Sequence, residues 1–219
     1  MAVTIDQLVD AKVHIWTLKN EAHPKTQKYW LDIVRGVVVI NPDVIAQQLN
    51  TVTSRIQEAK KAGKQILVVS EKKMYMKELE ELASKGGFHY LNHKIPAGFL
   101  TNFETLQKRI ATMNETAKFL ESEDFETLTK KEQLTHKRSL AKTQKIYKWV
   151  KWLTTRPDMV IIVDGQMMKS LVAEVKVSGV DGIVIASTNF GFLWPESSLV
   201  MANVQSFSSV NFVLSTLLS

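Results

Sequence analysis

The sequence predicts an α/β fold in which helices cover both faces of a parallel sheet. Short apolar runs occur at residues 37–40, 66–69, 160–163 and 182–186, where the sequence reads VVVI, ILVV, VIIV and GIVIA. Nearly continuous apolar runs are typical of strands that are buried on both faces. Segments with helical periodicity alternate with these runs, and that alternation is typical of parallel sheets.

The first half of the chain carries clear signals for where its helices begin and end. Asn41 can cap a helix whose first residue is Pro42, and apolar residues at helical spacing continue it until Gly63. A second helix is predicted over about 74–84, before a glycine pair, and residues 88–91 form a candidate strand.

The second half repeats the alternation. A helix is predicted over 167–178, between the last two apolar runs, and Gly179 ends it. Residues 208–218 are predicted to form a closing helix.

Between these two halves, residues 101–154 are predicted to form an inserted helical hairpin, so that residues 1–100 and 155–219 together make the sheet domain. Thr101 and Glu104 fit a capping box at the start of its first helix. Apolar residues then follow at alternating spacings of three and four, as in a short coiled coil. They are Phe103, Leu106, Ile110, Met113, Ala117 and Leu120.

The second helix of the hairpin has its own start signal. Thr129 and Glu132 fit another capping box, and Leu140, Tyr147 and Val150 lie on one side of the helix that follows. An acidic turn at 121–124 separates the two helices. Two amphipathic helices around a polar turn predict an antiparallel pair.

The charge of the chain is unevenly distributed. The net charge is +6, but residues 157–219 carry two basic and five acidic residues, which leaves +9 for residues 1–156. Within residues 129–156 there are nine basic residues and one acidic residue, Glu132. This concentration predicts a surface that meets a polyanion, and a solvated lysine-rich helix is the alternative interpretation.

Composition excludes several classes of protein. The chain has no cysteine, so disulfides, thiolate metal sites and cysteine nucleophiles are excluded. A hydrophobic content of 45% is enough for a sizeable core. No apolar run approaches the roughly 20 residues that cross a bilayer, and we expect no membrane partner. The N-terminus resembles neither a secretory nor a transit peptide, so we expect the protein to work where it is made.

The residues that an enzyme would need do not assemble in the sequence. Residues 85–87 lack the spacing of a phosphate loop, and Ser70 lacks a nucleophile elbow. Asp164 follows a strand at the edge where such sheets bind ligands, although a turn or cap role beside Gly165 is the better interpretation. We therefore expect no catalytic residue, no cofactor, no metal site and no small-molecule substrate. The alternative is a small nucleotide-binding enzyme that uses this carboxyl edge near Ser70, Asp164 and Thr188.

Basic residues beside amide or aromatic groups are better candidates for function. Lysine neutralises phosphate, while asparagine and histidine can bind sugars or base edges, so these clusters indicate RNA binding. In the sheet domain the candidates are His23, Lys25, Lys28, Lys72, Lys73, Asn92, His93 and Lys94. In the basic arm of the hairpin they are Lys130, Lys131, Lys137 and Arg138.

Short motifs also follow one another in a characteristic order. They are AKVH at 11–14, HPK at 23–25, GVVVIN at 36–41, GKQILVV at 63–69, NH at 92–93, GFLTNF at 98–103, FETLTKKE at 125–132, RPD at 156–158 and AE at 173–174. This order, from residue 8 to about 218, resembles the small-subunit ribosomal protein two family of bacteria and organelles. The LTN and LTKKE pair, at this separation, is the most specific part of the match.

The resemblance implies a flavodoxin-like α/β domain with an inserted coiled-coil hairpin. It also implies a structural protein of the small ribosomal subunit that binds small-subunit rRNA at the junction of head and body and supports translation without catalysis. The expected partners are that rRNA and neighbouring small-subunit proteins. His14, Thr101 and Asn102 lie in the matching motifs and join the RNA-binding candidates.

The sequence departs from the family pattern at several loops. Trp16 stands where the family usually has glycine, KIPA at 94–97 and two threonines at 154–155 replace other loop sequences, and FGF at 190–192 stands where Asp-Pro is usual. The departures at 190–192 affect the least basic part, so the rRNA expectation is better supported than docking of protein one. Together with 23 lysines against five arginines, they favour a mitochondrial ribosome over bacterial cytoplasm or plastid.

Overall fold

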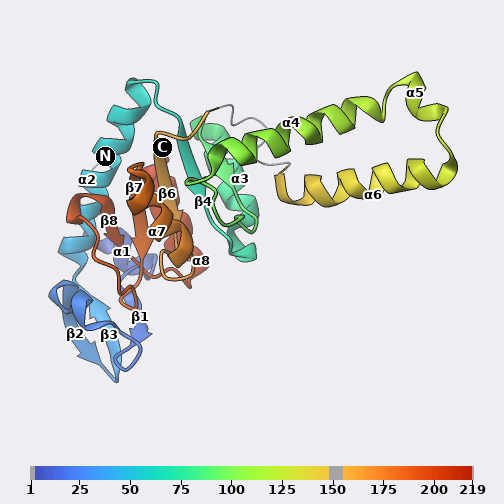
Figure 1. Cartoon of the computed structure of the whole chain (residues 1–219). Coiled ribbons are helices and arrows are strands. Elements are labelled where there is room, and N and C mark those ends of the chain that lie inside the picture. Colours follow the sequence, from blue (N-terminus) through green and yellow to red (C-terminus); the bar gives the residue numbers. More distant parts are fainter. Residues whose placement is uncertain (1–2, 148–154, 219) are drawn as a thin grey trace.

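The computed structural model describes residues 3–147 and 155–218, and its central feature is a five-stranded parallel sheet (Figure 1). In spatial order the strands are β5 (His89–Leu91), β4 (Ile66–Val69), β6 (Met159–Val163), β7 (Asp181–Ala186) and β8 (Leu199–Met201). All four neighbouring pairs run parallel. Numbered along the chain, the strand order is 2-1-3-4-5, which is the flavodoxin-like arrangement. The predicted fold class is therefore confirmed.

Helices cover both faces of this sheet. They are α2 (Pro42–Lys61), α3 (Met76–Gly86), α7 (Lys169–Ser178) and α8 (Phe207–Leu217), with a short α1 (Ile5–Asp10) at the N-terminus. The 3₁₀ turns are η1 (Pro24–Tyr29), η2 (Lys73–Tyr75) and η4 (Glu196–Ser198). In Figure 1, α7 lies in front of the strands and α8 behind them. The boundaries of α2, α3, α7 and α8 lie within two residues of the predicted ones, whereas α1 and the 3₁₀ turns were not predicted.

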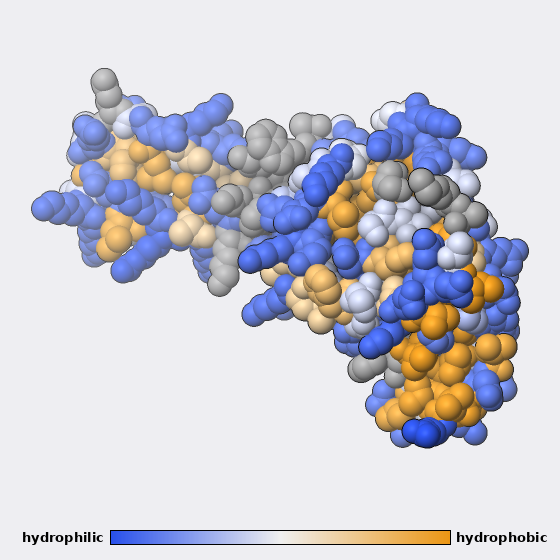
Figure 2. Space-filling view, turned by 180° about the vertical axis from the view of Figure 1, so that it is seen from behind, coloured by the Kyte–Doolittle hydropathy of each residue, from blue (hydrophilic) through white to orange (hydrophobic). Residues whose placement is uncertain are grey.

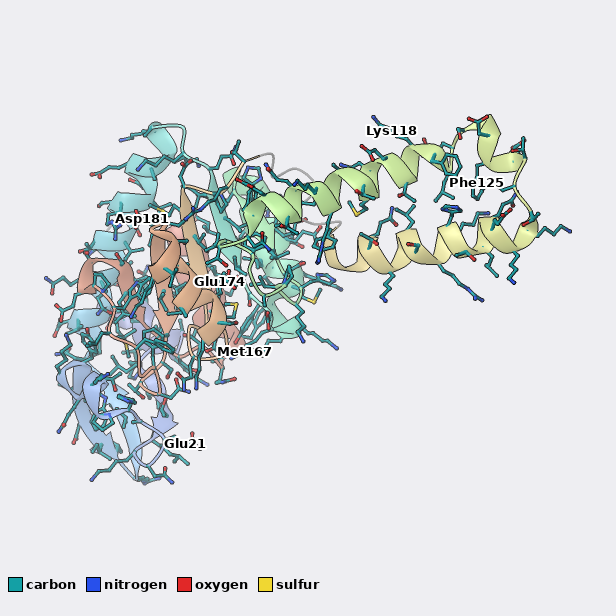
Figure 3. The ribbon with its side chains drawn as sticks, viewed as in Figure 1. Glu21, Lys118, Phe125, Met167, Glu174 and Asp181 are labelled. Carbon is teal, nitrogen blue, oxygen red and sulfur yellow. The ribbon has the colours of Figure 1, made fainter. Side chains whose placement is uncertain are left out.

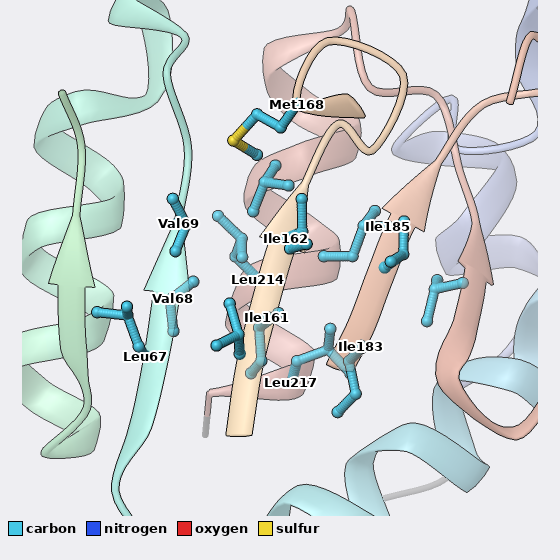
Figure 4. Packing of buried hydrophobic residues seen from close by; sticks show 14 of the residues in the cluster. Leu67, Val68, Val69, Ile161, Ile162, Met168, Ile183, Ile185, Leu214 and Leu217 are labelled. Atoms are coloured by element: carbon cyan, nitrogen blue, oxygen red, sulfur yellow. The ribbon is translucent and has the colours of Figure 1, made fainter. Parts of the chain in front are cut away.

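The core lies on both faces of the sheet, where buried residues of α2, α3, α7 and α8 pack against it. Every residue of β4 and β6 is buried, as the apolar runs predict. Leu214 and Leu217 of α8 pack toward β6 in Figure 4. Burying one such side chain contributes about 1.5–3 kcal/mol, so this interior dominates the stability of the domain.

One strand was assigned to the wrong sheet. Residues 37–40 do form a strand, β3 (Val37–Ile40), but it belongs to a separate antiparallel sheet with β1 (Ile15–Leu18) and β2 (Trp30–Val34), which the sequence did not predict. Only alternate residues of β3 are buried, because one face of this small sheet remains accessible. The fifth parallel strand is instead β8, whose three residues give too short an apolar signal.

A tight turn explains how β2 and β3 pair. Arg35 and Gly36, the two residues between the strands, have φ angles of 52° and 81°. Two-residue hairpin turns with positive φ at both positions match the twist of antiparallel strands.

The insertion contains α4 (Phe103–Phe119), the short α5 (Glu123–Glu126) and α6 (Lys130–Tyr147). α4 and α6 lie side by side and extend away from the sheet (Figure 1). Of the predicted apolar stripe, Phe103, Leu106, Ile110 and Met113 are buried. The continuation of the second helix to Val150 lies outside the described residues, and the coiled-coil geometry and the domain boundaries remain predictions.

One of the two predicted capping boxes is confirmed and the other is wrong. Thr129 N–H donates to Glu132 Oε2 at 3.0 Å, and Glu132 N–H donates to Thr129 Oγ1 at 3.5 Å. At α4, however, Asn102 rather than Thr101 is the residue before the first turn. Its Oδ1 accepts a hydrogen bond from Thr105 Oγ1 at 2.6 Å, one position later than the pattern predicted.

Glu174 of α7 fixes the base of the insertion. Its Oε1 accepts from Gly98 N–H at 2.8 Å, and its Oε2 accepts from Leu100 N–H at 2.9 Å. Figure 3 shows Glu174 on the side of α7 that faces this segment. The chain is therefore held three residues before α4 begins. Within the described ranges, no helix is both long and apolar enough to cross a membrane.

Candidate nucleic-acid interface

The carboxyl edge of the parallel sheet, where the enzyme alternative would place a nucleotide, is filled by an internal ion pair. Lys72 Nζ lies 2.6 Å from Asp164 Oδ2 and donates to Val204 O at 2.7 Å. Tyr75 Oη donates to the same carbonyl at 2.7 Å. Asp164 is buried. Charged side chains are rarely buried unless they are paired, and here the pair closes the space between β4 and β6.

At this edge the ionisable side chains of Tyr75 and Asp164 are buried, and burial shifts the pKa of the tyrosine. Burial, together with the nearby Asp164 charge, raises the pKa of Tyr75 to about 12. Asp164 also has a φ of 71°, and its Oδ1 accepts from Met167 N–H at 3.1 Å. The turn role expected for Asp164 is thus confirmed, and its ion pair with Lys72 was missed because the two residues are far apart in sequence.

The N-terminal segment covers the rest of the same edge. Thr17 Oγ1 lies 2.8 Å from Ser187 Oγ, and both groups are buried. Thr26 Oγ1 and His23 N–H each donate to Thr188 O at 2.8 Å. The N-terminal segment therefore covers the carboxyl end of β7, and Ser70 and Thr188 are both buried.

The RNA-binding candidates of the N-terminal segment gather at η1. Lys25 and Lys28 are exposed there, and Lys25 N–H donates to His23 Nδ1 at 3.2 Å. Lys28 also pairs with Glu196, which raises the lysine pKa and lowers the glutamate pKa through their hydrogen bond. Both side chains are exposed, so this pair contributes little to stability. His14 is buried, and its Nδ1 has no hydrogen-bond partner.

A second group lies at the ends of the paired strands β4 and β5. Lys73 and Lys94 are exposed, while Asn92 is buried with its Nδ2 donating to Met76 O at 3.3 Å. Asn92 Oδ1 lies 2.8 Å from His93 Nδ1. Asn92 therefore positions the histidine, and the lysines on either side are the groups that face solvent. Lys72, by contrast, is engaged inside the domain.

The third group lies on the hairpin. Lys130, Lys131, Lys137 and Arg138 are all exposed on α6, and Thr101 and Asn102 are exposed at the base of α4. The one acidic residue of this arm, Glu132, is held in the capping box, whose hydrogen bonds from Thr129 lower its pKa.

Aromatic side chains pack between α4, α5 and α6 at the end of the hairpin where the chain turns back. Phe119 of α4 makes an edge contact with Phe125, with ring centroids 6.0 Å apart, and another with His136 of α6 at 5.6 Å. Lys137 Nζ lies 5.5 Å from the Phe125 ring. Figure 3 shows Phe125 between the ends of the two helices.

The structure therefore places the exposed candidates in three groups, at η1, at the ends of β4 and β5, and on the hairpin. Sequence reasoning missed Lys108, Arg109 and Lys142, which line a hollow between α4 and α6. Their spacing relative to the apolar stripe could have placed them beside it.

A different kind of surface covers the antiparallel sheet. Leu18, Leu31 and Val34 are 46%, 61% and 51% exposed. Figure 2 shows hydrophobic residues gathered over this sheet, whereas the hairpin is mainly hydrophilic. Large exposed apolar patches mark contacts with other proteins, so the two ends of the molecule present different chemistry.

Comparison with known proteins agrees with the motifs. The family model described as "Ribosomal protein S2" matches residues 8–219. A curated relative, the small ribosomal subunit protein uS2 of Coprothermobacter proteolyticus, is 32% identical over 187 residues, which cover 85% of this chain and 70% of the relative. The chain belongs to the ribosomal protein S2 family.

Proposed function

We propose that this protein is a structural constituent of the small ribosomal subunit that supports translation by binding small-subunit rRNA near the junction of head and body. Family membership and the uS2 relative support the place in the small subunit. The concentration of basic residues on the hairpin is the observation that supports rRNA binding. Exposed cations line α6, and the one acidic residue of that arm is occupied by its capping box.

Two surfaces share the binding in this proposal. The lysines of α6 meet phosphates along the hairpin, and Lys25, Lys73 and Lys94 meet phosphates at the carboxyl edge. Phosphate contacts position a protein on RNA without reading its sequence, so exposed lysines suffice for this role. The apolar antiparallel sheet faces a neighbouring small-subunit protein.

The role is non-enzymatic. The nucleotide-binding alternative needed an open carboxyl edge, and Lys72, Asp164 and the N-terminal segment fill that edge. The family match supports the same conclusion.

The proposed location is the ribosome of a mitochondrion. The support is the lysine-rich composition, with 23 lysines against five arginines, and the loops that depart from the family pattern. The matched relative is bacterial and adds nothing to this choice. Co-sedimentation with small subunits from purified mitochondria tests it, and recovery from another compartment contradicts it.

The rRNA proposal is tested by a salt series. With about five phosphate contacts, the slope of log affinity against log salt should be about −4 for a small-subunit rRNA fragment. Reversing two charges, Lys131→Glu with Arg138→Glu, should weaken binding and make the slope shallower by about 2.

The matched control reverses two exposed lysines that precede β4, at the opposite edge of the sheet, Lys61→Glu with Lys64→Glu. This control changes the net charge equally and should leave the slope within error. A slope near zero for the unmodified protein, or equal losses in both double variants, contradicts the proposed interface.

A further inference from the structure

Helix α7 holds both ends of the inserted hairpin. On the entry side, the Glu174 carboxylate accepts hydrogen bonds from Gly98 N–H and Leu100 N–H, at 2.8 and 2.9 Å. On the exit side, Arg156 donates to Ser178 O, the carbonyl of the last residue of α7. The hairpin extends away from the sheet at this point (Figure 1). The position of α7 therefore determines where the insertion leaves the sheet domain.

Contacts just before α4 carry that position into the helix. Phe99 and Leu100 are each 1% exposed, so this part of the chain is embedded in the core. Gly98 O accepts a hydrogen bond from Asn102 N–H at 2.8 Å. The rings of Phe99 and Phe103 make an edge contact, with centroids 6.3 Å apart. α4 therefore starts from a segment that is fixed to α7.

The direction of α4 also determines that of the basic arm. Arg109 Nη1 on α4 donates to Tyr147 Oη on α6 at 3.1 Å, and the two helices lie side by side. α4 has 17 residues, which span about 25 Å. A rotation of about 15° at its base would move its far end by about 7 Å, well beyond the roughly 2.8 Å of a charge-assisted hydrogen bond. Small changes at the base therefore decide which phosphates the lysines of α6 can reach.

Glu174 is the contact at this base whose removal leaves the core closed, because its side chain is half-buried and polar. It makes no ion pair within the part of the chain that the structure describes, so its two oxygens are committed to backbone donors. Bonds from backbone N–H groups to a carboxylate are stronger than neutral ones. Two such bonds to donors two residues apart fix the direction of the segment as well as its position.

We propose that Glu174 is a positioning residue for RNA binding, which holds the hairpin at the angle where the lysines of α6 and those of the carboxyl edge reach one rRNA together. This inference rests on the proposed function. Two linked sites gain affinity from their effective concentration, and the gain is lost when geometry prevents both from engaging. Loss of Glu174 should therefore weaken binding to a folded rRNA without removing any phosphate contact.

The test compares Glu174→Ala with Glu81→Ala, which removes an exposed carboxylate from α3. Both changes raise the net charge by one, and that alone favours binding to a polyanion. A loss of affinity in Glu174→Ala alone therefore has the opposite sign to its electrostatic effect. Glu174→Gln keeps the side-chain length and one acceptor oxygen, so it should lie between Glu174→Ala and the unmodified protein.

Two measurements are made on the full chain. Because the chain has no cysteine, Gln57→Cys on α2 and Thr135→Cys on α6, both exposed, place one spin label on each part, and pulsed electron paramagnetic resonance gives the distance between them. Affinity is measured for a small-subunit rRNA fragment and for poly(U). Poly(U) has no fixed shape, so its binding does not depend on the angle of the hairpin.

In Glu174→Ala we expect a broader or shifted label distance and about tenfold weaker binding to the rRNA fragment, with no loss of affinity for poly(U). In Glu81→Ala the label distance should stay unchanged, and rRNA affinity should stay equal or rise slightly. An unchanged label distance in Glu174→Ala, or an rRNA affinity equal to that of Glu81→Ala, overturns the inference alone. Failure of the unmodified protein to bind the rRNA fragment overturns the proposed function and the RNA part of this inference, while the label distance still decides whether Glu174 sets the angle.

Discussion

Lysines occupy two contrasting environments in this protein, the carboxyl edge of the parallel sheet and the outer surface of α6. At the edge, Lys72 lies between Asp164 and Val204 O, and its side chain is 13% exposed. On α6, Lys130, Lys131 and Lys137 all face solvent. The same residue type stabilises the fold in one region and remains available to a polyanion in the other.

The difference arises because the charged groups are buried at the carboxyl edge and hydrated on α6. Buried charges need partners, because an isolated charge in the interior is strongly destabilising. Exposed lysines keep their hydration until a phosphate replaces it, and their binding is salt-dependent. Substitutions should therefore affect stability at the edge and RNA affinity on α6.

The largest effect on stability is expected for Lys72→Met. This change leaves the Asp164 carboxylate buried without its partner, which should cost about 3–5 kcal/mol of unfolding free energy. Urea denaturation followed by circular dichroism measures the loss. Lys73→Met, at the exposed neighbouring residue, is the control and should change stability by less than about 0.5 kcal/mol.

A double variant sharpens this test. Lys72→Met with Asp164→Asn removes both charges, and asparagine tolerates the left-handed backbone at residue 164. It should recover part of the lost stability. If the single and double variants are equally unstable, the ion pair is not the reason for the loss.

The hairpin should unfold separately from the sheet domain. Ile110→Ala removes a buried side chain of α4 and should cost about 2–5 kcal/mol locally. Limited proteolysis should then cut within residues 103–147 while the sheet domain stays intact. Ile161→Ala in β6, a buried isoleucine of the sheet, should instead expose the whole domain. Equal protection of the hairpin in Ile110→Ala and the unmodified protein contradicts this expectation.

The smallest effect is expected at the start of α6. Thr129→Ala removes the capping hydroxyl, which should cost the first turn about 1 kcal/mol. The pKa of Glu132 is held low mainly by its side-chain hydrogen bond with Thr129, so it should rise in the variant. Because that pKa is lowered in the folded state, the cap is complete at neutral pH and is lost as the pH falls through it.

Carboxyl NMR titration measures the pKa of Glu132, and amide exchange over residues 130–133 measures fraying of the helix. Lys131→Ala changes an exposed side chain in the same turn without removing the cap and should leave that pKa low. An unchanged Glu132 pKa in Thr129→Ala would show that another group stabilises the carboxylate.

The parallel sheet was largely predictable because its strands are apolar on both faces. β4, β6 and β7 are buried almost throughout, so their runs mark them without knowledge of the fold. β8 has three residues and follows a 3₁₀ turn, and β2 is mostly exposed, so neither carries that pattern. β3 was found but misplaced, since a run of valines does not reveal whether one or both of its faces are covered.

The residue types of the candidate interface were predictable from the sequence, but the burial and contacts of the individual residues were less so. The lysines of α6 were identified from charge alone, and the structure places them on the exposed surface of the hairpin. Lys72 was grouped with Lys73 because adjacent lysines look alike in sequence, and only the tertiary fold reveals Asp164 beside one of them. Lys108, Arg109 and Lys142 were missed because the apolar spacing predicts helices that pack closely over their whole length.

The closure of the carboxyl edge by the N-terminal segment has a consequence for synthesis of the chain. The hydrogen bonds from Thr17, Thr26 and Asn203 join residues separated by 170, 162 and 188 positions. Residues 15–40 leave the ribosome first, but their partners on β7 and after β8 emerge last. Contacts at such separations form slowly because the intervening chain must first be brought together. Until translation nears its end, β1, β2 and β3 can pair with one another but cannot dock on the parallel sheet, so the side of this small sheet that Ser187, Thr188 and Asn203 later contact stays open to chaperones.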